Sequence, residues 1–326
     1  MKDQLGRELN YLRISVVDRC NLRCLYCMPS GGAGFEAWDE LLSYDEIVYL
    51  TGIFAELGVK KVRITGGEPL IRKNLDELIG RIRQVPGISE IALSTNGVFL
   101  KEQIQSLRAA GLDRVNISLD TLRLDRFLKI AQRDRLSQVL EGIDAALESG
   151  ITPVKINAVL MKGFNTDEIL DLVRFAVSKS IEIRFIELMT THENVAIDPK
   201  EQFFSTQEAK ALIEREYELI PVDAYFSSPA QVFQIKGTSS RVGLISPISC
   251  FFCMRCNRVR LKANGAMKSC LHGKEDLNLK DLIRAGISRS EIKKRIEDAV
   301  YVRPEQHFLN DTAVRHQDFQ MSHVGG

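Results

Sequence analysis

Short β-branched runs alternate with amphipathic segments of helical period through the first two-thirds of the chain. The expected strands are 12–17, 61–65, 90–95, 114–119, 154–160 and 182–188. The expected helices, with apolar residues three and four positions apart, are 44–57, 75–84, 101–110, 136–149 and 166–178. Strands that alternate with helices predict an α/β fold with a parallel sheet. The pattern leaves open whether that sheet is doubly wound or curved into an incomplete barrel.

The pattern changes near Pro221, where hairpins replace the alternation. The strands and helices expected there are 231–235, 241–245, 258–262, 266–269, 279–285 and 290–299. Asn264-Gly265 is a strong signal for a two-residue hairpin turn. We therefore expect one domain over residues 1–220 and a smaller α+β domain over residues 221–326.

Charge and cysteine content restrict the class of protein. Lys and Arg number 44 against 43 Asp and Glu, which argues against a nucleic-acid partner. No apolar run approaches the roughly 18 residues that span a bilayer, and the N-terminal residues lack the apolar core of a signal peptide. We therefore expect a cytoplasmic protein that does not bind membranes. In that reducing compartment, 7 cysteines in two groups predict metal ligation rather than disulfides.

Cations interrupt the apolar alternation of four expected strands, at Arg13, Arg63, Lys155 and Arg184. Neighbouring strand residues point to opposite faces, so each cation lies opposite its apolar neighbours. Because the outer face of such a sheet packs on helices, we expect these four side chains to point inward. A buried cation without an anion costs several kcal/mol, so the set needs negative charge.

The visible inner carboxylates are too few to balance these cations. Asp120 or Glu187 is expected to neutralise one or two of them. A polyanionic substrate such as a triphosphate would neutralise the rest, since Lys and Arg are the usual phosphate binders. The alternative is that the cations lie at strand edges with solvated charges. Polar residues near the strand ends, where parallel α/β proteins place their active sites, are Ser94, Thr95, Asn116, Ser118 and Asn157.

The first cysteine group is Cys20, Cys24 and Cys27, with the spacing Cys-x3-Cys-x2-Cys. Three thiolates cannot complete the four-ligand set of a structural zinc site or an ordinary 4Fe–4S cluster. They suit a 4Fe–4S cluster with one iron left open for a non-protein ligand. The alternative is a zinc knuckle with a distant fourth ligand. Downstream, the glycines of Gly66-Gly67-Glu68-Pro69 let the main chain approach a ligand closely.

The second cysteine group is Cys253, Cys256 and Cys270, with the spacing Cys-x2-Cys-x13-Cys. One interpretation is a zinc ribbon that takes Cys250 or His272 as its fourth ligand. The other is a second 4Fe–4S cluster with an open iron, and the presence of the first group favours it. Cys250 is then a bystander.

The segment 18–29, with Tyr26 before its last cysteine, and the Gly-Gly-Glu-Pro run resemble the radical S-adenosylmethionine (SAM) enzymes. The resemblance implies an incomplete (β/α)6 TIM-type barrel, followed here by a smaller iron–sulfur domain. It implies that the first cysteine group holds a 4Fe–4S cluster whose open iron is chelated by SAM. The positions implied to contact SAM are Tyr26, Gly67, Ser118 and Met189.

Within that superfamily, Cys-x2-Cys-Asn-Arg-x-Arg at 253–260 and the terminal Gly-Gly resemble the GTP-cyclising enzymes that open molybdenum cofactor biosynthesis. The resemblance covers essentially the whole chain. It implies a lyase reaction in which a 5′-deoxyadenosyl radical removes the 3′ hydrogen of GTP and the ribosyl radical adds to C8 of guanine. The product would be 3′,8-cyclo-7,8-dihydro-GTP.

The same resemblance assigns residues to the substrate. The second cysteine group would hold a second 4Fe–4S cluster whose open iron receives guanine. The implied GTP contacts are Arg13, Arg63, Thr95, Lys155, Arg258, Val259 and Arg260. Catalytic roles fall to Arg13, Lys155 and Arg184, and the tail Gly325-Gly326 is expected to reach into the active site.

Partners also follow from the resemblance. We expect a reductant such as flavodoxin or ferredoxin, transfer of the product to cyclic pyranopterin monophosphate synthase, and a monomer or homodimer. One rival interpretation is another radical SAM enzyme with a C-terminal cluster domain, such as a peptide-modifying maturase, although those carry more C-terminal cysteines. The other is a non-catalytic zinc or iron–sulfur module acting on nucleic acid, which the neutral charge balance disfavours.

Overall fold

The computed structural model describes residues 1–28, 34–189, 197–198, 200–222, 228–307 and 321–325. Its strands are β1 (Tyr11–Ser15), β2 (Lys61–Thr65), β3 (Glu90–Thr95), β4 (Arg114–Ser118), β5 (Val154–Leu160), β6 (Glu182–Glu187), β7 (Leu219–Val222), β8 (Ala230–Ile235), β9 (Arg241–Ile245), β10 (Arg258–Leu261), β11 (Ala266–Lys268) and β12 (Leu277–Asn278). Within the described ranges they form one 12-stranded sheet, in the order β12-β11-β10-β1-β2-β3-β4-β5-β6-β9-β8-β7.

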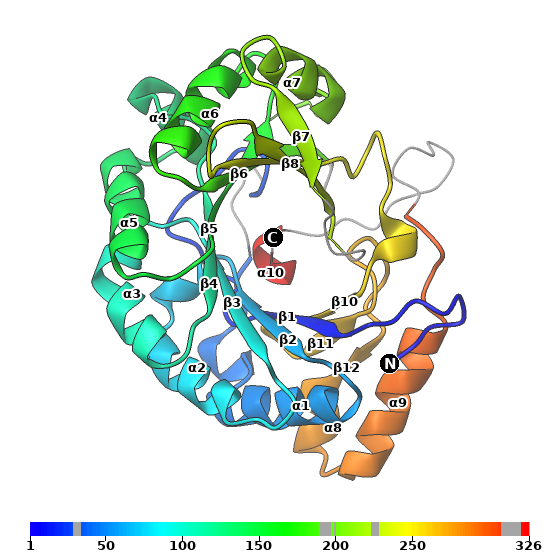
Figure 1. Ribbon diagram of the computed structural model, residues 1–326. Helices are drawn as coiled ribbons and strands as arrows, with labels where there is room; N and C mark the ends of the chain where they lie inside the picture. Colours follow the sequence, from blue (N-terminus) through cyan, green and yellow to red (C-terminus); the bar gives the residue numbers. More distant parts are fainter. Residues whose placement is uncertain (29–33, 190–196, 199, 223–227, 308–320, 326) are drawn as a thin grey trace.

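The centre of this sheet is parallel and its two ends are antiparallel. β1 to β6 are parallel neighbours in sequence order, β10 joins β1 in parallel and β9 joins β6 in parallel. Both expected hairpins are present, as β8–β9 and β10–β11. The sheet curves around a lumen without closing on itself (Figure 1). This confirms the α/β fold with an incomplete barrel.

The C-terminal part of the chain does not stand apart from that barrel. β9 and β10 extend it at opposite ends, next to β6 and β1. The helices α8 (Leu279–Arg284) and α9 (Arg289–Tyr301) then contact α1 (Tyr44–Glu56) on the outside of the barrel. The region after residue 221 therefore helps to build the lumen wall as well as its own hairpins.

Helices cover the outer face of the sheet (Figure 1). They are α1 (Tyr44–Glu56), α2 (Leu75–Arg83), α3 (Leu100–Ala109), α4 (Leu124–Ala131), α5 (Leu136–Glu148), α6 (Ile169–Ser178), α7 (Thr206–Ile213), α8 (Leu279–Arg284) and α9 (Arg289–Tyr301). The short helix α10 (Met321–Val324) lies inside the lumen instead (Figure 1). The expected helices are present with small shifts at their ends. α4, α7 and α10 were not expected, and they correct the sequence-based assignment.

Helix starts follow local chemistry. Ser43 caps α1 in a reciprocal capping box with Glu46, which satisfies two main-chain N–H groups that the helix itself leaves unpaired. Asn74 directly precedes α2, but its backbone is left-handed and its side chain makes no capping hydrogen bond.

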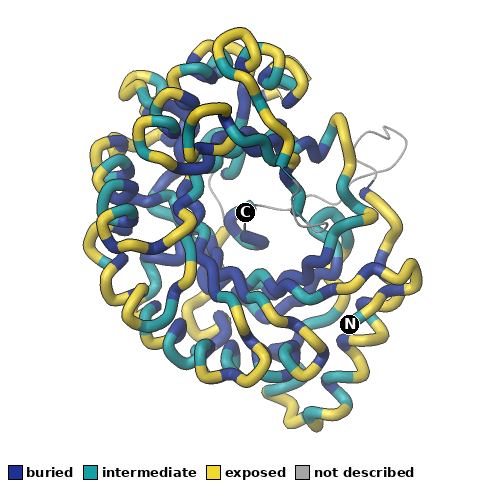
Figure 2. Tube along the Cα trace, in the orientation of Figure 1, coloured by how far each residue is buried: buried dark blue, intermediate teal, exposed yellow. Residues whose placement is uncertain are grey.

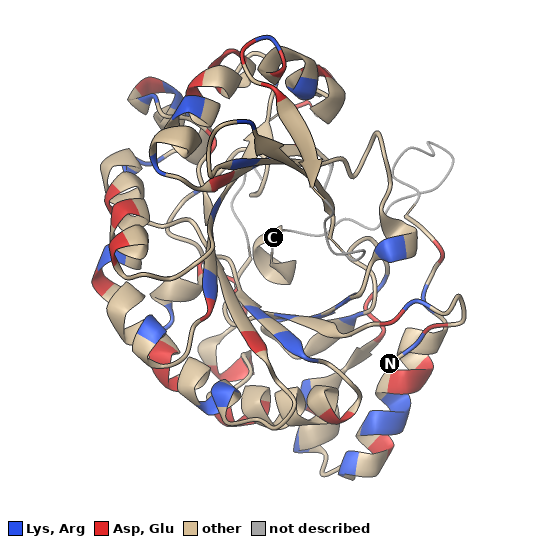
Figure 3. Cartoon of the chain, in the orientation of Figure 1, with Lys and Arg blue, Asp and Glu red and all other residues tan. Residues whose placement is uncertain are grey.

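Strand alternation separates the core from the lumen. Leu12 and Ile14 are fully buried in the main hydrophobic cluster, while Arg13 between them points the other way. Figure 2 shows buried backbone along the central strands, and Figure 3 shows Lys and Arg on strands that border the lumen. No helix in the described part of the chain is long and apolar enough to cross a membrane.

Candidate active site

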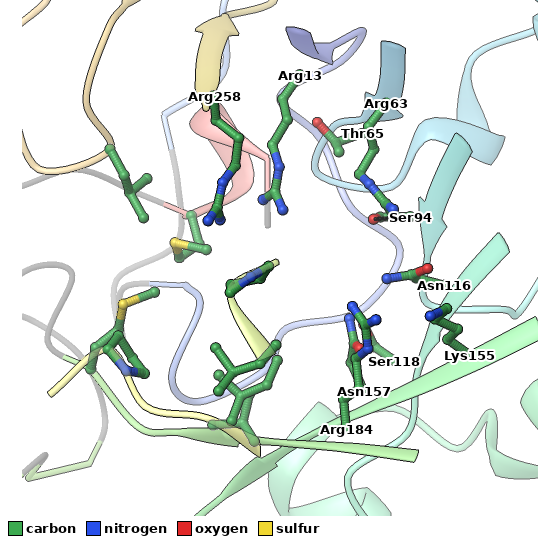
Figure 4. A pocket seen from close by; sticks show the side chains of 18 of the residues that line it. Arg13, Arg63, Thr65, Ser94, Asn116, Ser118, Lys155, Asn157, Arg184 and Arg258 are labelled. Atoms are coloured by element: carbon green, nitrogen blue, oxygen red, sulfur yellow. Dashed lines mark hydrogen bonds between the residues drawn. The ribbon is translucent and has the colours of Figure 1, made fainter. Parts of the chain in front are cut away.

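The inner strand faces enclose a cavity of about 910 Å³. Register places Arg13 on β1 between Arg63 on β2 and Arg260 on β10. Lys155 and Arg184 line the same cavity from β5 and β6 (Figure 4). The prediction that the four strand cations face inward is therefore confirmed.

Four of the cavity arginines, Arg13, Arg114, Arg258 and Arg303, carry a buried donor without an acceptor among the described residues. Arg13 Nε and Arg258 Nη2 are buried and lack a hydrogen-bond partner among the described residues. Burial, assisted by the guanidinium groups of Arg258 and Arg63, lowers the pKa of Arg13 to about 10, and Tyr11 opposes the shift. Unpaired buried donors of this kind favour an anionic ligand in the cavity.

The cations of β5 and β6 share one carboxylate. Lys155 Nζ lies 2.7 Å from Glu182 Oε2, and Arg184 Nε lies 2.5 Å from Glu182 Oε1. Burial and the nearby Arg184 lower the pKa of Lys155 to about 8 although Glu182 opposes the shift. One carboxylate against two cations leaves positive charge on this wall.

The expectation that Asp120 or Glu187 neutralises a strand cation is wrong for the described residues. Asp120 instead accepts hydrogen bonds from Tyr26 Oη at 2.8 Å and from the Val159 N–H at 2.8 Å. Glu187 accepts from the main-chain N–H groups of Thr206 and Ser249. Both carboxylates are hydrogen-bonded to donors from other segments of the chain, and neither forms an ion pair with a strand cation among the described residues.

The first cysteine group lies on the loop after β1, and its three thiols line the cavity. The N–H of Leu22 donates to Cys20 Sγ at 3.4 Å, and the N–H of Cys27 donates to the Cys24 carbonyl at 2.9 Å. Burial raises the pKa of Cys20 to about 11 and that of Cys27 to about 12. Thiolates at this site therefore need a cationic centre to offset burial, which suits a metal cluster.

The Gly-Gly-Glu-Pro turn packs against this loop. A Cβ at Gly67 would collide with the Arg19 carbonyl, so the close approach requires glycine. Glu68 accepts from Thr95 Oγ1 at 2.7 Å and from the Asn96 N–H at 2.7 Å. Burial raises the pKa of Glu68 to about 7. Thr95, which was expected to contact substrate, therefore uses its hydroxyl as a hydrogen-bond donor to Glu68.

The residues expected to contact SAM lie around the same end of the cavity. Tyr26, Gly67, Ser118 and Met189 all line it, from the cysteine loop, the turn after β2, the end of β4 and the segment after β6. The C-terminal ends of parallel strands gather there, as in other α/β active sites.

The second cysteine group flanks β10 and β11, next to β1, and lines the same cavity. Cys253, Cys256 and Cys270 contribute to the cavity, whereas Cys250 is exposed and does not. Burial alone would raise the pKa of Cys256, but Arg258 and Arg303 lower it to about 6. Among the described residues, no three His, Cys, Asp or Glu side chains come close enough to hold a single metal ion. The cysteines of a 4Fe–4S cluster bind separate irons, so this spread does not conflict with a cluster.

The C-terminal helix α10 lies in the lumen (Figure 1). The main-chain N–H of Ser322 donates to the Cys27 thiol. Arg260 Nη1 donates to the Val324 carbonyl at 3.1 Å and also to the Gly325 carbonyl. Gly326, the last residue assigned to the tail, lies outside the described residues.

Some site residues differ from expectation, and others were missed. Val259 is fully buried in the hydrophobic core and does not line the cavity.

Tyr11 was missed: it lines the cavity, accepts a hydrogen bond from Arg63 Nε, and lies under three cations. Burial alone would raise the pKa of Tyr11, but Arg63 and Arg13 lower it to about 7. Its position two residues before Arg13, on the same strand face, was a usable signal.

Family comparisons agree with this geometry. The model of the radical SAM superfamily matches residues 14–176, and the model described as Molybdenum Cofactor Synthesis C matches residues 181–309. The crystal structure of Streptococcus suis SuiB bound to S-adenosylmethionine is similar, with 15% identity and a TM-score of 0.62 over 88% of this chain and 68% of that one. A further crystal structure of Streptococcus suis SuiB gives a TM-score of 0.63, with 15% identity over 91% of this chain and 66% of the other. At such identity the likeness shows the fold alone.

The curved sheet, the three-cysteine loop after its first strand and the family match define a radical SAM enzyme, which uses SAM and an iron–sulfur cluster. GTP 3′,8-cyclases of Alkaliphilus metalliredigens and Moorella thermoacetica are 43% and 42% identical to this chain, each over 327 residues and 100% of both sequences. The chain belongs to the GTP 3′,8-cyclase family.

Proposed function

We propose that this chain converts GTP into 3′,8-cyclo-7,8-dihydro-GTP, the first step of molybdenum cofactor biosynthesis. Full-length similarity to GTP 3′,8-cyclases supports this assignment. The observation that carries it is the cationic cavity, in which Arg13 Nε and Arg258 Nη2 are buried without an acceptor. A triphosphate supplies several charged acceptor oxygens and would satisfy such donors.

The first cysteine group and its surroundings would hold the radical-generating cofactors. Cys20, Cys24 and Cys27 would ligate one 4Fe–4S cluster and leave one iron for SAM. Together, SAM and this cluster supply the 5′-deoxyadenosyl radical that takes the 3′ hydrogen of the GTP ribose. Tyr26, Gly67, Ser118 and Met189 line the cavity beside this group and would surround SAM. Asp120 would fix the Tyr26 ring through their 2.8 Å hydrogen bond.

The phosphates would lie against the arginine row and the β5–β6 cations. Arg13, Arg63, Arg258 and Arg260 belong to three neighbouring strands, and Lys155 and Arg184 face them across the cavity (Figure 4). Arg13, Lys155 and Arg184 would orient the substrate and neutralise its charge during the reaction. Thr95 would act mainly through Glu68, and Val259 only through its main chain. The tail, through Gly325, would close the wall beside Arg260.

Cys253, Cys256 and Cys270 would hold a second 4Fe–4S cluster with an iron open toward guanine. The placement of all three thiols on the cavity wall supports a role in substrate binding over a remote zinc ribbon. Cys250 is exposed and away from the cavity, which supports its place as a bystander.

The remaining assignments follow the family. A small flavodoxin or ferredoxin would deliver electrons, and cyclic pyranopterin monophosphate synthase would receive the product. We place the enzyme in the cytoplasm as a monomer or homodimer. Functionally, residues 1–220 would bind SAM and residues 221–326 would bring the second cluster and the tail to the substrate.

Anaerobic reconstitution tests the proposal. Iron and sulfide are counted, and the reduced protein is then incubated with SAM and GTP. About eight irons per chain, together with 5′-deoxyadenosine and a cyclised GTP product, are expected. About four irons with zinc, and no GTP-dependent turnover, would overturn both the second cluster and the substrate.

A further inference from the structure

A buried arginine that lines the same cavity forms two hydrogen bonds to one cysteine of the second group. Arg303, just after α9, is 3% exposed. Its Nη2 donates to Cys256 Sγ at 2.9 Å and its Nη1 donates to the Cys256 carbonyl at 3.0 Å. The planar fork thus holds the sulfur and the main chain of a single residue.

The thiolate of Cys256 is the natural counter-ion of this guanidinium. No carboxylate of the described residues forms an ion pair with Arg303, and its Nε has no partner there. The nearby carboxylate of Asp3 is bound to Arg7 at 2.5 Å. Because a buried cation without an anion is costly and the other described groups leave Arg303 without one, its guanidinium depends on its two contacts with Cys256.

Arg7, in the N-terminal segment, hydrogen-bonds to the chain on both sides of the Arg303–Cys256 contact. Arg7 Nη1 donates to the Cys253 carbonyl at 3.1 Å and to the Glu305 carbonyl at 2.7 Å, while its Nη2 donates to the Pro304 carbonyl at 2.7 Å. Arg7 therefore ties the chain around Arg303 to the cysteine loop. The two segments that meet in the Arg303–Cys256 contact are therefore both hydrogen-bonded to Arg7.

The first cysteine group has the opposite electrostatic surroundings. In the described part of the chain, the donors to Cys20 are neutral: the Leu22 N–H at 3.4 Å and Asn96 Nδ2 at 3.6 Å. The carboxylates that face the group are Glu68 and Asp120. Local charge and hydrogen bonds to the sulfurs are among the factors that set the reduction potential of an iron–sulfur cluster.

We propose that Arg303 is a positioning residue that raises the reduction potential of the second cluster above that of the SAM-binding cluster, by donating an N–H to Cys256 Sγ and by its charge. The inference rests on the proposed second cluster. The cluster that must deliver an electron to SAM then remains the stronger reductant of the two.

Potentiometric titration of the reconstituted full-length protein, followed by electron paramagnetic resonance, tests this role. Arg303→Gln removes the charge, and Arg303→Lys keeps the charge but loses the fork. Arg295→Gln, at an exposed arginine of the preceding helix α9, is the matched control. A chain with Cys20, Cys24 and Cys27 all replaced by Ala identifies the signal of the second cluster.

Arg303→Gln is expected to lower the potential of the second cluster, with a smaller fall in Arg303→Lys and none in Arg295→Gln. The potential of the SAM-binding cluster is expected to stay fixed. An unchanged second potential in Arg303→Gln with about eight irons overturns the inference. If Arg303→Gln does not load its second cluster, the same titration of Arg303→Lys decides. About four irons in the unmodified protein would instead refute the second cluster itself.

Discussion

The side chain of Thr65 occupies the space that a side chain at Gly325 would need. A Cβ at Gly325 would overlap Thr65 Oγ1 and lie 2.7 Å from Thr65 Cβ. Thr65 cannot withdraw easily, because it is 1% exposed and its hydroxyl donates to the Ile14 carbonyl at 3.1 Å. The tail thus fits the barrel wall only as glycine.

Replacing Gly325 with Ala is expected to displace the tail and lower the rate of cyclised product by about tenfold or more, since small misplacements at an active site have large effects. Gly286→Ala is the matched control: its φ is also +72°, but nothing lies within 4 Å of the added Cβ. Both variants bear similar backbone strain, and only the first has a collision. Equal product rates in the two variants, measured by chromatography, would contradict this account.

Arg13→Met is expected to affect stability and binding in opposite directions. Removing a half-buried guanidinium whose Nε is buried without a partner should leave the ligand-free protein as stable or about 1 kcal/mol more stable. The apparent affinity for GTP should fall by about 2 kcal/mol, or roughly thirtyfold. Thermal unfolding and kcat/KM for GTP measure the two effects. Arg174→Met, at an exposed ion pair, should change neither; a destabilised Arg13→Met with normal kcat/KM would be the contrary result.

Loss of the proton from Lys155 is expected to lower kcat/KM for GTP at alkaline pH. Its pKa, lowered mainly by burial to about 8, means that the ammonium is charged below that pH and loses its proton above it. kcat/KM for GTP, which reports groups of the free enzyme, should therefore decline above about pH 8. The variant Lys155→Arg retains its charge and should abolish this decline. An identical pH profile in both proteins would assign the decline to another group.

The linked effect on stability has a definite sign. The folded pKa of Lys155 lies below the ordinary value of 10.5, so the unfolded chain binds more protons between about pH 8 and 10.5. Lys155 should therefore contribute stability above pH 10.5 that is lost as the pH falls through 8. The difference in unfolding free energy between the unmodified protein and Lys155→Met should follow this curve.

Cys256→Ser and Cys250→Ser separate a proposed ligand from a bystander. Cys256 lines the cavity, and Cys250 is exposed away from it. Cys256→Ser should reduce the iron content from about eight to about four per chain and abolish cyclisation. Cys250→Ser should retain both. Loss of iron in Cys250→Ser would make that residue a fourth ligand and remove the open iron from the second cluster.

Alternation was enough to predict which strand residues face the lumen, because side-chain direction in a strand has a fixed period of two. It did not identify their counter-ion. Glu182 meets Lys155 through the register between β5 and β6, which no local pattern encodes. Its position two residues before Arg184, on the same face of β6, was a local signal that was overlooked. Asp120 and Glu187 were reasonable carboxylates by position, but loop donors from distant residues hydrogen-bond to them instead.

Helix prediction failed for two different reasons. α4 has no side-chain cap at Arg123, so its start carries no local signal. α7 does begin with a capping box of Ser205 and Glu208, and this signal was overlooked. The site residues Arg303 and Arg7 were also missed, since their roles depend on contacts with residues of the cysteine loop that lie 47 and 246 residues away in the sequence.

The pairing of β1 with β10 has a consequence for how the enzyme is made. Asn257 donates to Asn10 across a separation of 247 residues, next to the start of both strands. During synthesis β1 is therefore without this neighbour until most of the chain has left the ribosome, and proteins are made at only about 5–20 residues per second. The wall that carries Arg258 and Arg260 does not exist in the nascent chain. Until β10 has been made and has paired with β1, the cavity beside the cysteine loop therefore lacks one of its walls.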